Sequence, residues 1–230
     1  STADPSCQPQ SHAMSRVAMC GLKLWLGEPE AAATHLQALA EVNSADLLPV
    51  ARVAVCLAQL RRCKDERVHA TLRRTLTELG REYPGLRDNA TLYREWARWE
   101  EPEQALLQLR RLIGELRQAG SPMAMRSLEL TEVELLIHRD AAAAARLAQR
   151  LATEVPQGVL ASVYPPQAWW TLARALHQGG EQAAAQECRA RALAWIEAAE
   201  LPETTEPEAF GPLHPVNGAV LAADWGRAGW

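Results

Sequence analysis

The sequence predicts an all-α fold, an α-solenoid of about five antiparallel helix hairpins with a C-terminal capping segment. Good helix formers such as Ala, Leu, Arg and Glu dominate the 230 residues, whereas the chain has one Phe and three Tyr. A turn also recurs about every 36 to 41 residues before an Ala- and Leu-rich run, at Glu28, Asp65, Glu101, Asp140 and Glu181. A fixed period of this length is typical of stacked helix pairs.

Five helices are predicted in the first hundred residues, after a polar lead-in over residues 1–10 that is expected to be disordered. Pro29 and Pro49 fall in the first turns of two of them, where a missing backbone N–H costs little. The predicted ranges are about 11–26, 29–42, from 44 or 46 to 62, 65–83, and a short helix after residue 89.

Five more repeat helices are predicted up to residue 200. Pro102, the Ser121–Pro122 pair and Asp140 open three of them, and the longest interruption lies between Pro156 and Pro166. After residue 200 the composition changes to Pro, Glu and Thr, and then to an apolar stretch. The predicted organisation is therefore a lead-in, a repeat domain and a Pro-rich linker with a capping tail, over residues 1–10, 11–200 and 201–230.

The last predicted hairpin resembles a tetratricopeptide repeat. That pattern alternates bulky and small residues on the first helix and places small residues on the second, and it is filled here by Trp169, Leu172, Ala173, Leu176, Gly180, Ala185 and Ala192. Small residues opposite large ones allow two helix axes to approach within about 8 to 10 Å. Arg189 departs from the pattern, because it stands where an aromatic residue is preferred on the second helix. The earlier units match mainly in period and turn position.

The tail carries a second resemblance. Residues 210–221 (FGPLHPVNGAVL) are similar to the ending that follows helical repeats in large bacterial ATPase-containing transcriptional regulators of the MalT and SARP architecture. Two arginines of that ending are absent, with His214 and Gly218 in the nearest places. The resemblance implies that this chain is the C-terminal sensing or assembly part of a regulator whose ATPase and DNA-binding domains lie outside it.

Several function classes are disfavoured by the sequence. A net charge of -4 gives no basic surface for nucleic acid, and no apolar run is long enough to cross a membrane. No phosphate loop, nucleophile elbow or zinc-protease motif is present, so no enzyme activity and no cofactor is expected. The five cysteines are odd in number and lack C-x-x-C spacing, and the six histidines lack helical metal-site spacing. We expect a cytoplasmic protein without a metal site.

Eight tryptophans are many for one domain, and they supply the first candidate site. Tyr93, Trp96 and Trp99 lie within one short predicted helix, where they form either a core wedge or an aromatic pocket on the concave face. Trp169 and Trp170 are neighbours on a helix and therefore point about 100° apart. Trp169 fits the structural position, which leaves Trp170 as the better contact candidate or as part of a second core interface.

Paired arginines supply the second candidate site, with Arg73, Arg74, Arg110 and Arg111 as its members. A solvated helix surface explains them without any special role. Alternatively, their guanidinium groups bind the carboxylates of a partner, since Arg binds carboxylates in a bidentate manner.

Taken together, these patterns predict a non-enzymatic protein-interaction or assembly module with a protein or peptide partner, self-association included. The alternative is a small-molecule-sensing domain, whose groove binds an effector and controls an attached ATPase or DNA-binding domain.

Overall fold

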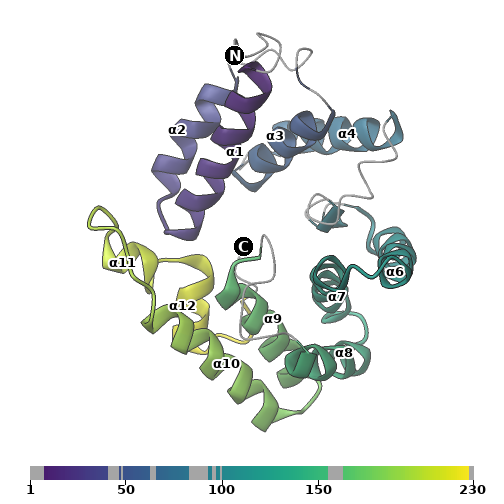
Figure 1. Ribbon diagram of the computed structural model, residues 1–230. Helices are drawn as coiled ribbons and strands as arrows, with labels where there is room; N and C mark the ends of the chain where they lie inside the picture. The colour runs from purple at the N-terminus through teal and green to yellow at the C-terminus, as the bar shows by residue number, and fades with distance from the viewer. Residues whose placement is uncertain are drawn as a thin grey trace. The chain divides into compact units, whose positions relative to one another are not determined.

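The computed structural model describes residues 8–40, 47, 49–62, 66–82, 93–94, 97–98, 100–154 and 163–227 (Figure 1). All regular secondary structure among these residues is helical, which confirms the predicted all-α class. The chain divides into two units, Ser1–Trp99 and Glu100–Trp230, called here the N-terminal unit and the C-terminal unit.

The N-terminal unit contains α1 (Gln8–Trp25), α2 (Pro29–Ala40), α3 (Pro49–Arg62) and α4 (Glu66–Glu82). Helix α1 packs against α2 and α3, and α3 packs against α4. Gly27 adopts a φ of 76° in the turn between α1 and α2, a conformation that glycine tolerates best, and Lys23 pairs with Glu28 across the same turn at 2.6 Å. Its described core includes two small apolar clusters, with Ala13, Leu39, Leu47 and Ala51 in one and Cys20, Leu24 and Ala32 in the other.

The C-terminal unit contains α6 (Pro102–Gln118), α7 (Pro122–Leu136), α8 (Ala141–Glu154), α9 (Pro165–Gln178), α10 (Gln182–Glu197), α11 (Pro207–Phe210) and α12 (Pro215–Ala222). Each long helix packs against the next one described along the chain, and α9 contacts α7, α8, α10 and α12. Every residue from 166 to 176 is buried, so α9 is the central helix of this unit.

Most predicted helix starts agree with those observed, but α1 begins at Gln8, within the lead-in over residues 1–10 that was expected to be disordered. Pro102 and Pro122 each occupy the first helical position, and Asp140 Oδ1 accepts a hydrogen bond from the Ala143 N–H at 2.9 Å to cap α8. Most of the short helix predicted after residue 89 lies outside the described residues.

The helices of the last hairpin, α9 and α10, pack closely, as the small residues in the repeat pattern predict. Ala185 and Ala192 are fully buried on α10. Where α8 meets the end of α9, a Cβ added to Gly179 would lie 2.3 Å from the Cβ of Ala145, so these two helices approach too closely for any larger side chain. Close contact of helix backbones therefore stabilises this end of the unit.

Helix α12 is held at both ends. At its N-terminus, His214 Nδ1 accepts hydrogen bonds from the backbone N–H groups of Val216 and Asn217. At its C-terminus, the Arg189 guanidinium donates to the carbonyls of Val220 and Leu221 at 2.8 and 3.1 Å. These contacts satisfy backbone groups that a helix leaves without partners, and they explain why an arginine stands at position 189.

Asn217 ties the tail to the start of α9. It is fully buried, its Nδ2 donates to the Phe210 carbonyl at 2.7 Å, and its Oδ1 accepts from the Tyr164 hydroxyl at 2.9 Å. Gly218 beside it has no room for a side chain, because an added Cβ would lie 2.3 Å from the Pro212 carbonyl oxygen. Residues 210–221 thus form a packed extension of the last hairpin.

Candidate functional site

Helix α9 presents its two neighbouring tryptophans to different parts of the C-terminal unit. The Trp169 ring faces α10, where the Arg191 guanidinium carbon lies 4.8 Å from the ring centroid. The Trp170 ring instead meets residues that follow α12. The predicted divergence of the two side chains is therefore confirmed.

The interpretation of Trp170 as an exposed contact residue is wrong. Trp170 is fully buried, and it is the largest of the fully buried side chains among the described residues. Its ring stacks on Trp225 with centroids 5.0 Å apart, and its Nε1 donates to the Arg227 carbonyl at 2.9 Å. The structure contains the second core interface, which the sequence favoured over a contact site.

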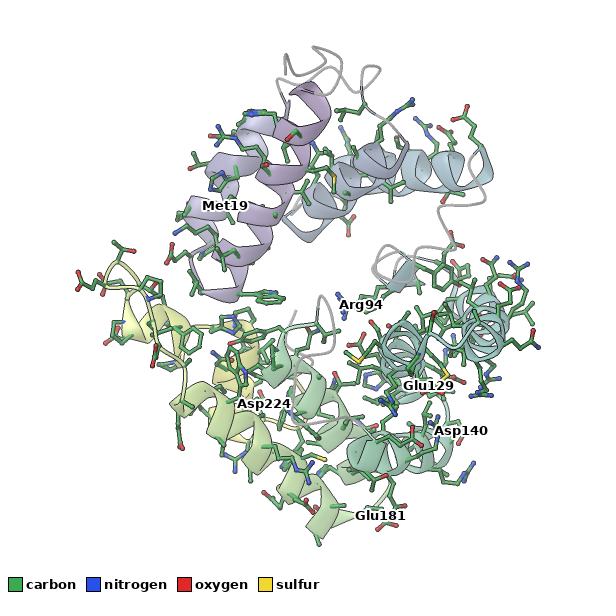
Figure 2. All side chains as sticks on the ribbon, in the orientation of Figure 1. Met19, Arg94, Glu129, Asp140, Glu181 and Asp224 are labelled. Atoms are coloured by element: carbon green, nitrogen blue, oxygen red, sulfur yellow. The ribbon has the colours of Figure 1, made fainter. Side chains whose placement is uncertain are left out.

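The segment that covers Trp170 is Asp224–Arg227, which we call the strap. Ala223 ends α12 in the left-handed conformation with a φ of 51°, and the backbone then turns back towards α9. Within the strap, the Arg227 N–H donates to the Asp224 carbonyl at 3.0 Å, so it is a tight turn. Asp224, at the start of the strap, is labelled in Figure 2.

A ladder of α9 side chains holds the strap, and its members are spaced i, i+4 and i+7. Trp170 contributes the stack and the hydrogen bond described above, Arg174 Nε donates to the Trp225 carbonyl at 3.2 Å, and the His177 ring stacks on Trp225 at 4.3 Å with the planes 3° apart. This spacing places all three on one helix face. The strap is thus recognised through two backbone carbonyls and one aromatic ring.

Arg174 is the unusual group in this ladder. Its side chain is 4% exposed, and its Nη2 is buried without a hydrogen-bond acceptor among the described residues. Burial lowers the pKa of the guanidinium, and the carboxylates of Glu134 and Asp224 oppose that effect. The Glu134 carboxylate itself accepts from the Thr171 hydroxyl at 3.4 Å. The face therefore contains a buried cation whose hydrogen-bonding capacity is only partly used.

Sequence reasoning missed Arg174 and His177. Their spacing from Trp170 is a signal that was present in the chain, together with an isolated Trp225 in a tail rich in Gly and Ala. The pattern alone did not show that residues 224–227 return to this helix.

The aromatic group predicted around Tyr93 is only partly described. Tyr93 is buried, so the interpretation of this residue as an exposed groove contact is wrong. Trp96 and Trp99 lie outside the described residues, and their assignment stays a prediction.

The described arginines of the predicted arginine site each pair with a carboxylate of their own unit. Arg74 pairs with Glu78 and Arg111 with Glu115, each one turn away on its own helix, at 3.8 and 3.2 Å. Arg110 of α6 pairs with Glu132 of α7 at 2.7 Å. The Arg73 side chain lies outside the described residues. Since the three described guanidinium groups are exposed and already paired, the solvated helix surface explains them, and partner binding by them stays a prediction.

A second charged group, also missed from the sequence, lies between α6, α7 and α8. Glu129 of α7, which is labelled in Figure 2, is buried and accepts from Arg150 Nη2 of α8 at 2.9 Å and from Arg117 Nη2 of α6 at 3.4 Å. Arg150 also pairs with Glu154 at 3.0 Å, and the hydrogen bond to Glu129 is the largest cause that raises the pKa of Arg150. These paired charges connect three helices, which is a structural role.

The described residues contain no group of His, Cys, Asp and Glu side chains arranged to hold a metal ion. Among the helices that the structure describes, none is long and apolar enough to span a bilayer. Comparison of the chain with protein families, curated proteins and solved structures finds no match.

Proposed function

We propose that this chain is a non-enzymatic protein-interaction module, and that the strap-covered face of α9 is its binding surface. One observation carries the proposal: Trp170 Nε1 and Arg174 Nε bind backbone carbonyls of a non-helical segment, while Trp170 and His177 stack on its aromatic ring. Carbonyl recognition accepts many sequences, and the aromatic ring adds selectivity.

The wider assignment rests on the sequence. We propose that the helices form an α-solenoid of about five tetratricopeptide-like hairpins, and that the chain is the C-terminal repeat part of a bacterial transcriptional regulator. Support comes from the buried Ala185 and Ala192 in the last hairpin and from the packing of α12 on α9 and α10. The small-molecule effector stays an alternative prediction.

Peptide selection tests the binding surface. A library of random peptides would be selected on the full chain, and each selected peptide would then be measured against Trp170→Phe and Arg174→Lys. Trp170→Phe keeps an aromatic ring but removes the Nε1 donor, and Arg174→Lys keeps the charge but removes the guanidinium geometry.

We expect both substitutions to weaken the selected peptides by roughly fivefold or more, because each removes a hydrogen bond to the bound segment. Leu107→Ala, a substitution at an exposed residue of α6, is the control and should leave binding unchanged. Peptides that bind all four chains equally would show that the α9 face is not the binding surface.

A further inference from the structure

We infer that the strap is an internal competitor for the α9 face, and that the external ligand is a protein segment with an aromatic residue beside an acidic residue whose carboxylate reaches Arg174 Nη2. This inference rests on the proposed function, because it names the partner chemistry of the same face. Three features of the strap support it.

The first feature is the contrast between the strap and the face it covers. Trp170 and Arg174 are buried, whereas Asp224, Gly226 and Arg227 are exposed and Trp225 is half-buried. Two side-chain hydrogen bonds from α9 hold the strap, and a bond from the Asp224 N–H to the Ala219 carbonyl at 3.0 Å anchors its start. The strap follows α12 without belonging to it, so it can leave α9 without unfolding a helix.

The second feature is the incomplete match between the strap and Arg174. The strap supplies a carbonyl to Nε, whereas Nη2 is buried without a hydrogen-bond acceptor among the described residues. Asp224 acts on Arg174 electrostatically, but its position at the end of α12 does not bring its carboxylate into a hydrogen bond with Nη2. A guanidinium group is suited to a carboxylate that binds two of its N–H groups. A segment that is not connected to α12 would place a carbonyl at Arg174 Nε and a carboxylate at Nη2.

The third feature is the backbone at the junction. Ala223 has a φ of 51°, a region that L-residues other than Asn and Asp seldom adopt. The connection between α12 and the strap therefore passes through an unfavourable backbone conformation. An external segment approaches the same face without that cost.

The ligand needs an aromatic residue because the two rings that stack on Trp225 belong to α9. Trp170 and His177 remain on the helix when the strap leaves, and together they offer stacking partners for a single planar side chain. The Glu134 carboxylate acts electrostatically on Arg174, so this face is not purely cationic and one carboxylate on the ligand is enough.

The experiment uses a fluorescein-labelled peptide with the sequence AADWGR, that of residues 222–227, and a matched peptide AANWGR that lacks the carboxylate. Binding to the full chain is measured by fluorescence anisotropy for the natural sequence, for Trp225→Ala, which removes the internal competitor's ring, and for Trp195→Ala. Trp195 is a 36% exposed tryptophan of α10 outside the ladder, so it controls for the loss of a tryptophan.

We expect Trp225→Ala to bind AADWGR roughly tenfold more tightly than the natural chain or Trp195→Ala, since apparent affinity rises with the fraction of open sites. On Trp225→Ala, AANWGR should bind about five- to tenfold more weakly than AADWGR, because a charged hydrogen bond is lost. Arg174→Lys in the Trp225→Ala chain should reduce this difference between the two peptides. Thermal unfolding of each chain establishes that it is folded.

Equal affinities of the natural and Trp225→Ala chains for AADWGR would overturn the inference that the strap competes for the α9 face. Equal affinities of the two peptides for Trp225→Ala would overturn the role of the ligand carboxylate. Either result leaves the proposed peptide-binding face intact. Failure of both peptides to bind folded Trp225→Ala would instead overturn the inference and the proposed function together.

Discussion

Replacement of Trp170 by alanine should strongly destabilise the C-terminal unit. The side chain is fully buried, stacks on Trp225 and donates to the Arg227 carbonyl. Truncation of a buried tryptophan costs about 3 to 5 kcal/mol through lost burial and the cavity left behind. For a protein of this size, that loss lowers the melting temperature by roughly 6 to 20 °C.

Two further variants separate the sources of this loss. Trp170→Phe keeps much of the apolar ring and removes the Nε1 donor, so we expect about 1 to 2 kcal/mol. Trp195→Ala should cost less than about 1 kcal/mol, because that side chain is partly exposed on α10.

Calorimetry of the full chain measures the shift, and hydrogen exchange followed by mass spectrometry assigns it to α9. The loss of stability on truncation requires a shift in melting temperature larger than about 3 °C. A smaller shift for Trp170→Ala would refute the packing of Trp170 against the strap. That result would restore the sequence-based view that Trp170 faces a groove and tolerates replacement.

Four other predictions follow from individual residues. Asn217→Ala should destabilise the unit by about 2 to 4 kcal/mol, because it removes two buried hydrogen bonds, and the loss should be smaller in a Tyr164→Phe background, as measured by urea unfolding in a double-mutant cycle. Ala223→Gly should stabilise the chain by roughly 0.5 to 1 kcal/mol by relieving the left-handed backbone, whereas a fall in melting temperature would contradict that conformation. Ala185→Leu should cost about 1 to 3 kcal/mol through overpacking between α9 and α10, and an unchanged melting temperature would show that this contact is loose. Burial raises the pKa of the Cys188 thiol to about 11, so iodoacetamide at pH 8 should label it only after unfolding; as pH rises from the ordinary thiol value towards 11 the unfolded state loses its proton first, so the stability that this group contributes falls across that range and stays lower above it.

The sequence predicted the helices well because their local signals are strong. Pro102, Pro122 and Asp140 mark helix starts by rules that depend only on nearby residues. The burial of Ala185 and Ala192 was likewise predictable from their place in the repeat pattern.

The candidate site was much less predictable, because it depends on contacts between residues distant in the chain. Helical geometry fixed the angle between Trp169 and Trp170, but the surroundings of Trp170 are set by the strap. Arg189 looked like a departure from a repeat, and only the position of α12 shows that it caps two carbonyls. The partners of Arg110 and Glu129 on neighbouring helices were hidden for the same reason.

Because the ribosome makes α9 before the tail, the strap can cover α9 only after a delay. Tyr164 and Asn217 are 53 residues apart, and Trp170 and Arg227 are 57 residues apart. At about 5 to 20 residues per second, a ribosome needs roughly 3 to 11 seconds to make the chain between Trp170 and Arg227. Throughout that interval a newly made α9 has its aromatic face uncovered. A chaperone, or the partner itself, therefore has access to this face before the chain's own strap exists to compete for it.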